Sequence, residues 1–163
     1  MAANLEGVEP SFTVSGDRAV TAPTHRGDRV TVLGPGSPRL LAFVPAAFTP
    51  VCSREIRDLS ELAVRAEQLG VQVYAISCDS PATLAAWLAA EDASGRIIGV
   101  SDHWPHGALA SMLGSFDEQT GTALRRTWAV RADGTRVLVA GTAAGEAREL
   151  HDHLRGVEWA AAE

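Results

Sequence analysis

Hydrophobic residues follow two different patterns in the first half of the chain. Residues 40–44 form a continuous apolar run of strand length, which predicts a strand covered on both faces of a sheet, and residues 71–77 predict a second buried strand. Between them, over residues 52–69, apolar side chains recur at helical spacing and charged side chains occupy the other faces. The order strand, helix, strand predicts a βαβ unit, in which two parallel strands are joined by a right-handed crossover.

The same patterns continue on both sides of this unit. Before it, short β-like runs at 12–14, 19–21 and 29–33 alternate with turn-forming residues and predict an N-terminal hairpin region. After it, we expect a helix from Pro81 to about residue 90, a strand over 97–100, a short helix over 106–113, a hairpin over 127–139 and a closing helix over 144–159. No repeat or linker interrupts the chain. The prediction is one α/β domain over residues 1–163, with a mixed central sheet flanked by helices.

Composition narrows the classes of function. The chain has 163 residues, 46% of them hydrophobic, and only two cysteines, Cys52 and Cys78, so a secreted disulfide framework is not expected. Residues 1–10 lack the pattern of a signal peptide, and no apolar run reaches the roughly 18 residues of a membrane helix. The net charge is -6 and the arginines are scattered among acids, which argues against nucleic acid as a partner. We expect a cytoplasmic protein with no membrane association.

Cys52 lies where local chemistry favours a reactive thiol. Thr49 is a good N-cap and Pro50 a good first helical residue, which places Cys52 at about the third position of the helix. Backbone N–H groups there have no acceptor within the helix and carry the positive end of its dipole, an environment that favours a thiolate. From position alone, a small buried cysteine without reactivity is an equally good interpretation.

The residues around Cys52 resemble the active-site signature of the peroxiredoxins, a thioredoxin-fold family. The signature is Pro-x-x-x-Thr-x-x-Cys after an apolar strand, matched here by Pro45, Thr49 and Cys52. Further segments at 75–80, 101–107, 116–119 and 125–128 are similar to the AhpE-like, one-cysteine branch of the alkyl hydroperoxide reductase/thiol-specific antioxidant group. The resemblance implies a thioredoxin-like fold and a thiol-dependent peroxidase that needs no cofactor or metal.

The resemblance also implies a role for each matching residue. Cys52 is the expected peroxidatic cysteine, Thr49 the residue whose hydroxyl bonds to the sulfur and the peroxide, and Pro45 the residue that limits solvent access. Arg125 is expected to stabilise the thiolate and the transition state, because it precedes Trp128 by the family's spacing, and neighbouring strand residues point to opposite faces. Glu55 matches an acidic position that would hold Arg125, although an exposed helix charge is an equal alternative.

The reductant is expected to come from outside the chain. The position five residues after Cys52, where one branch carries a resolving cysteine, holds Arg57, and no cysteine follows Cys78. A one-cysteine cycle follows, in which a low-molecular-weight thiol or a redoxin recycles the Cys52 sulfenic acid. Cys78 is a possible resolving cysteine, but a buried inert thiol is the better interpretation.

Other functions and partners follow from the same residues. A Cys-x-x-Cys oxidoreductase is disfavoured because Glu55 stands where the second cysteine belongs, and a cysteine hydrolase lacks a histidine placed beside Cys52. A peroxide sensor or thiol-relay protein, or a cysteine enzyme acting on a non-peroxide substrate, remains an alternative. Because the family often dimerises through loops around the active site, a homodimer using Phe48 and Trp104 is expected by analogy.

Overall fold

A five-stranded sheet forms the centre of the protein, seen in a computed structural model that describes residues 19–143 and 145–162. The strand order is β5-β4-β3-β8-β9. β3, β4 and β5 are parallel, whereas β8 pairs antiparallel with both β3 and β9, so the sheet is mixed. The strands are β3 (Arg39–Phe43), β4 (Gln72–Ser77), β5 (Ile97–Ser101), β8 (Arg126–Val130) and β9 (Arg136–Gly141).

The predicted βαβ unit consists of β3, helix α1 (Pro50–Gln68) and β4. All five residues of β3 are buried, as expected for a continuous apolar strand with both faces covered. Leu40 lies beside Val73, and Phe43 beside Ile76, in a regular parallel register. The carboxyl ends of β3 and β4 therefore lie together, next to the start of α1.

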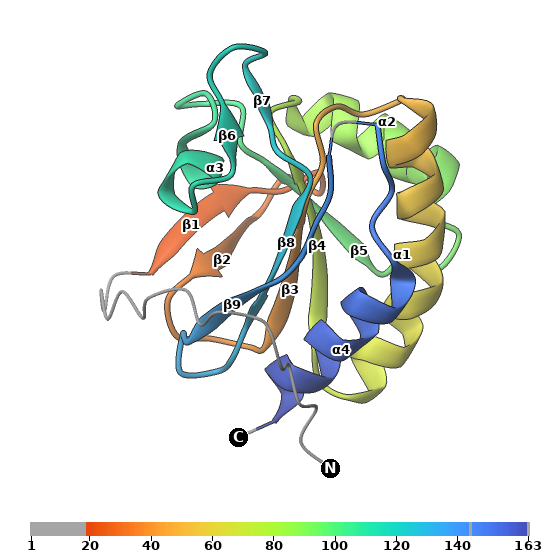
Figure 1. Ribbon diagram of the computed structural model, residues 1–163, viewed down its shortest axis with the longest axis vertical. Helices are drawn as coiled ribbons and strands as arrows, with labels where there is room; N and C mark the ends of the chain where they lie inside the picture. Colours follow the sequence, from red (N-terminus) through yellow and green to blue (C-terminus); the bar gives the residue numbers. More distant parts are fainter. Residues whose placement is uncertain (1–18, 144, 163) are drawn as a thin grey trace.

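Helices and small strands cover opposite faces of the sheet (Figure 1). On one face, α1, α2 (Pro81–Glu91) and α4 (Leu150–Ala161) pack on an apolar cluster that includes Leu40, Ile56 and Trp87. The other face carries a second apolar cluster, which includes Leu41, Phe43 and Trp128. It is covered by the β1–β2 hairpin (Val20–Pro23 and Arg29–Leu33), α3 (Ala108–Met112) and the β6–β7 hairpin (Phe116–Asp117 and Thr122–Ala123).

The structure confirms the α/β class, the mixed sheet and the N-terminal hairpin, and it corrects two details. The predicted start of the closing helix at 144 is wrong, because α4 begins at Leu150 and Glu149 is its extended N-cap. The β6–β7 hairpin was not predicted, because its two-residue strands are too short to show alternation. The predicted run at 12–14 lies outside the described residues.

In residues 19–143 and 145–162, no helix combines the length and the apolar character needed to cross a membrane.

Candidate active site

Cys52 lies in the first turn of α1, at the carboxyl end of the neighbouring strand β3. The helix begins at Pro50, and the Thr49 carbonyl accepts the first helical hydrogen bond from Ser53 N–H at 2.9 Å. Cys52 is therefore the third helical residue, where backbone N–H groups have no helical acceptor. The first turn contains no acidic residue to compete for the positive end of the helix dipole. The side chain of Cys52 is fully buried.

Arg125 is the side chain that meets the Cys52 sulfur. Its Nη2 donates to Cys52 Sγ over 3.4 Å, although the two residues are 73 positions apart in the chain. Arg125 directly precedes β8, which is paired with β3, and its side chain is 5% exposed. The neighbouring Arg126 points elsewhere and donates to the Gly114 carbonyl. Arg125, and not Arg126, therefore lies at the sulfur, which agrees with opposite directions for neighbouring strand side chains.

Glu55 holds the Arg125 guanidinium from one helical turn beyond Cys52. Its carboxylate forms a buried ion pair with Arg125 Nη1 and is itself 2% exposed. The exposed-charge alternative for Glu55 therefore does not describe this structure. Burial acts to raise the pKa of Glu55, but hydrogen bonds and charge from Arg148, together with Arg125, outweigh it and leave the pKa below its ordinary value of 4.5.

Arg148 is the site residue that sequence reasoning missed. It chelates Glu55, with Nε donating to Oε2 at 2.8 Å and Nη2 to Oε1 at 3.2 Å, and its backbone N–H also donates to Oε2 at 2.9 Å. These bonds involve both the backbone and the side chain, which explains why residues 145–149 are not helical. The only signal in the sequence was a single arginine near the start of an amphipathic helix, which is not specific.

The charges of this cluster balance in only one ionisation state of the sulfur. Arg125 and Arg148 carry +2 and Glu55 carries -1, which leaves +1 among side chains that are all at least 95% buried. An uncompensated buried charge is strongly unfavourable. A Cys52 thiolate would bring the sum of these side-chain charges to zero. Arg125 Nε is buried and has no hydrogen-bond partner among the described residues, so the guanidinium that contacts the sulfur keeps an unpaired donor.

The loop between β3 and α1 carries the remaining predicted residues. Pro45 is half-buried at the start of this loop. The Thr49 hydroxyl donates to the Ala46 carbonyl at 3.0 Å, and no bond to Cys52 Sγ is found among the described residues, so its contact with sulfur or peroxide stays a prediction. The loop is tied to β4 by Asp79, whose Oδ2 accepts from Ala47 N–H at 2.8 Å. Phe48 has a positive φ of 63°, a conformation that costs an aromatic residue energy.

Cys78 follows β4 directly and has a different environment from Cys52. It is partly buried, and both cysteines are free. Burial, followed by the negative charges of Asp102 and Asp79, raises the pKa of Cys78 to about 11. At neutral pH this thiol is therefore protonated, and a protonated thiol is a poor nucleophile.

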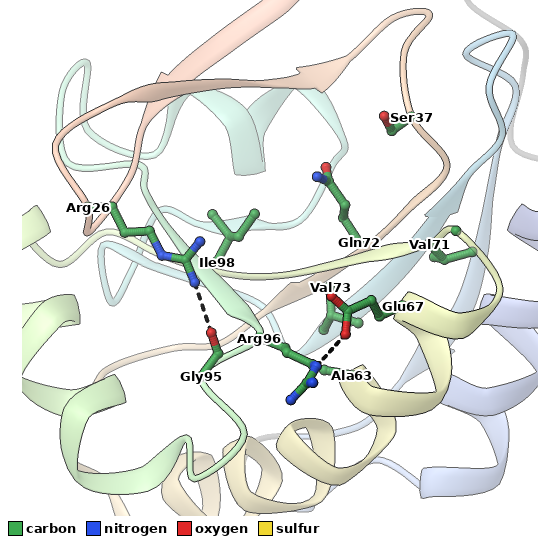
Figure 2. Close-up of a pocket in the computed structure, with 11 residues that line it drawn as sticks. Arg26, Ser37, Ala63, Glu67, Val71, Gln72, Val73, Gly95, Arg96 and Ile98 are labelled. Carbon is green, nitrogen blue, oxygen red and sulfur yellow. Dashed lines mark hydrogen bonds and ion pairs between the residues drawn. The ribbon is translucent and has the colours of Figure 1, made fainter.

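A hollow of about 350 Å³ lies at the opposite end of the parallel strands (Figure 2). Its rim includes Gln72 at the start of β4 and Arg96 just before β5. The two arginines there are already engaged, because Arg26 donates to the Gly95 carbonyl at 2.9 Å and Arg96 is paired with Glu67. Because no cysteine is among the described residues that line this hollow, and Cys52 lies at the far end of the strands, the Cys52 cluster is the better candidate active site.

Comparison with known proteins identifies relatives over most of the chain. A model of the AhpC/TSA family matches residues 15–137. Alkyl hydroperoxide reductase E of Mycobacterium tuberculosis (strain ATCC 25618 / H37Rv) is 32% identical over 133 residues, which are 80% of this chain and 80% of that protein. Alkyl hydroperoxide reductase C of Escherichia coli (strain K12) is 34% identical over 116 residues, 71% of this chain and 62% of that protein.

Solved structures show the same arrangement of elements. AhpC of Enterococcus faecalis superposes with a TM-score of 0.75 at 25% identity, covering 93% of this chain and 89% of that one. Peroxidoxin BcpB of Mycobacterium tuberculosis gives a TM-score of 0.70 at 20% identity, covering 86% of this chain and 92% of that one, and supports the fold alone. These likenesses confirm the thioredoxin-like fold.

Proposed function

The chain belongs to the AhpC/TSA family of peroxiredoxins, and on that premise we propose that it is a thiol-dependent peroxidase with Cys52 as the peroxidatic residue. The observation that carries the assignment to Cys52 is its buried contact with Arg125, within a cluster that only a thiolate makes neutral. The proposed substrates are hydrogen peroxide and organic hydroperoxides. The names of the alkyl hydroperoxide reductase relatives support this class.

The reaction is a displacement at the O–O bond. The Cys52 thiolate attacks the terminal oxygen of the hydroperoxide, an S–O bond forms and the O–O bond breaks. The cysteine becomes a sulfenic acid, and the departing alkoxide or hydroxide takes a proton from water to leave as alcohol or water. Negative charge moves from sulfur to the departing oxygen during this step, so fixed donors beside the sulfur lower the barrier. The unpaired Nε–H of Arg125 is the donor that we assign to this role. The Thr49 hydroxyl, which donates to the Ala46 carbonyl in this structure, would turn toward the peroxide to act as a second donor.

Recycling uses thiols from outside the chain. One thiol condenses with the sulfenic acid to give a mixed disulfide and water, and a second thiol releases Cys52 and forms the external disulfide. Cys78 is poorly suited to the first step, because burial and two nearby carboxylates keep it protonated. A low-molecular-weight thiol or a redoxin therefore remains the proposed reductant, in a one-cysteine cycle. The presence of two free cysteines supports a reducing compartment, for which we propose the cytoplasm.

A homodimer is part of the proposal. Phe48 and Trp104 are 58% and 82% exposed, which is unusual for large apolar side chains. Phe48 lies in the loop that precedes Cys52, so an interface there would cover the approach to the active site. Sedimentation of the reduced protein at micromolar concentration tests this part, with Trp104→Ser as the variant that should weaken association.

Turnover is the experiment that tests the function. Purified protein is mixed with hydrogen peroxide or a fatty-acid hydroperoxide and excess dithiothreitol, and the peroxide remaining is measured over time. Many equivalents should be consumed by the wild type and by Cys78→Ser, and none above background by Cys52→Ser. Consumption of a single equivalent without turnover would contradict the enzyme and favour a sensor. Equal consumption by Cys52→Ser would remove Cys52 from the reaction.

A further inference from the structure

Two buried polar side chains lie behind the cluster and make no contact with the sulfur. Thr127 is in β8, two residues after Arg125, and therefore points to the same face of the sheet. His153 is in the first turn of α4, five residues after Arg148. Thr127 is fully buried and His153 is 2% exposed. Their side chains hydrogen-bond each other, with 2.8 Å between Thr127 Oγ1 and His153 Nε2.

Both side chains are connected to the far side of the Arg148 guanidinium. Arg148 uses Nε and Nη2 to chelate Glu55, and its remaining nitrogen, Nη1, donates to the Phe43 carbonyl at 2.7 Å and to Thr127 Oγ1 at 3.1 Å. An arginine can only donate, so the Thr127 oxygen accepts this bond. Its hydroxyl hydrogen is then available for His153.

The tautomer of His153 sets the direction of the last bond. Burial, followed by the positive charge of Arg148, lowers the pKa of His153 to about 3, so the ring is neutral at pH 7. In the neutral tautomer that carries its proton on Nδ1, Nε2 is the acceptor, and Thr127 donates to His153 while it accepts from Arg148. Hydrogen bonds in such a series strengthen one another in a buried setting. The series runs from His153 through Thr127, Arg148, Glu55 and Arg125 to the Cys52 sulfur.

We propose that Thr127 and His153 are positioning residues of the peroxidatic site, which fix the Arg148 guanidinium so that Glu55 holds Arg125 against Cys52 Sγ. This inference rests on the proposed function and extends it to residues that do not touch the substrate. Packing alone does not require these polar atoms, because valine has nearly the shape of threonine. The hydroxyl of Thr127 instead acts together with the Phe43 carbonyl to limit rotation of Arg148 around its bonds to Glu55.

Variants at Thr127 separate the hydroxyl from the shape of the side chain. Thr127→Val keeps the volume and removes the hydroxyl, whereas Thr127→Ser keeps the hydroxyl. Two properties are measured in each: the second-order rate of Cys52 oxidation by hydrogen peroxide, and the pH dependence of Cys52 alkylation by iodoacetamide in the Cys78→Ser background. We expect Thr127→Val to oxidise about tenfold more slowly and to require a higher pH for alkylation. Thr127→Ser should stay within about twofold of the wild type in both properties.

A stability control shows whether any effect is specific. Val137→Ala removes buried volume from β9. Val137 belongs to the apolar cluster on which α1, α2 and α4 pack, and it is not part of the series of hydrogen bonds. It should lower thermal stability but leave both properties at Cys52 unchanged. The proposal is overturned if Thr127→Val matches the wild type in both properties, or if Val137→Ala changes them as much. Alkylation needs no peroxide, so a failure of this inference is distinguishable from a failure of the peroxidase function, in which the wild type itself would not react with peroxide.

Discussion

Acidification should destabilise the fold through His153 well before most carboxylates are protonated. The buried, neutral imidazole has a pKa of about 3 in the folded protein, compared with an ordinary value of 6.5. Between these two values the unfolded chain binds a proton at this position and the folded protein does not. The free energy of unfolding therefore falls as the pH drops through that interval, and the contribution of His153 is fully present only above about 6.5.

The magnitude follows from the two pKa values. At pH 5 the histidine is almost fully protonated in the unfolded chain and almost fully neutral in the folded protein. This pH lies about 1.5 units below the ordinary pKa of histidine. At 1.36 kcal/mol per unit, this corresponds to about 2 kcal/mol lost between pH 7 and pH 5. A domain of this size has a total stability on the order of 5–15 kcal/mol, so the effect is large enough to measure.

Urea unfolding of His153→Gln at pH 7 and pH 5 tests this value. Glutamine does not titrate and can still bond to Thr127, so the variant should lose about 2 kcal/mol less than the wild type on acidification. His151→Gln is the matched control, because His151 is an exposed histidine in the same helix turn. The reasoning is refuted if the wild type and His153→Gln show the same pH dependence.

Further predictions concern the residues nearest the sulfur. Glu55→Gln leaves two buried arginines without a carboxylate, so urea unfolding at pH 7 should show a loss of about 3 kcal/mol, and a loss below about 1 kcal/mol would argue against the charge balance described above. Arg125→Ala should slow oxidation of Cys52 by roughly 100-fold, whereas Arg126→Ala should change it little; stopped-flow fluorescence measures both, and equal effects would reverse the assignment. Cys78→Ser should leave peroxide turnover with an external thiol unchanged, and mass spectrometry of the peroxide-treated wild type should show no internal disulfide; finding that disulfide would end the one-cysteine cycle.

Local patterns were sufficient to predict the elements that carry Cys52. The continuous apolar run of β3, the helical spacing of α1 and the Thr49–Pro50 start are all short-range features, and each lies where the pattern placed it. The choice of Arg125 over Arg126 needed the family's spacing to Trp128, because the alternation of neighbouring side chains near β8 says only that one of the two can reach the sulfur. For Glu55 the pattern left two possibilities, because a charged residue beside an apolar stripe is compatible with either exposure or pairing.

The roles of Arg148, Thr127 and His153 could not be predicted from the sequence, for a physical reason. Arg148 acquires its role from Glu55, which is 93 residues away, and Thr127 and His153 acquire theirs from Arg148. These contacts depend on where α4 packs against the sheet, and no local periodicity contains that information. The same contacts explain the late start of α4, since the backbone N–H of Arg148 is directed to Glu55 instead of continuing a helix.

Direct observation of the first chemical step tests the central claim about Cys52. Reduced protein is mixed with hydrogen peroxide in a stopped-flow instrument, and the intrinsic fluorescence of its tryptophans is followed at increasing peroxide concentration. Trp87 donates to Ser53, the residue after Cys52, which places one indole close to the site. We predict a concentration-dependent change on the order of 100-fold faster than oxidation of a free cysteine, and absent from Cys52→Ser. Oxidation at the rate of a free cysteine, or a fluorescence change in Cys52→Ser as large as that of the wild type, would contradict the account.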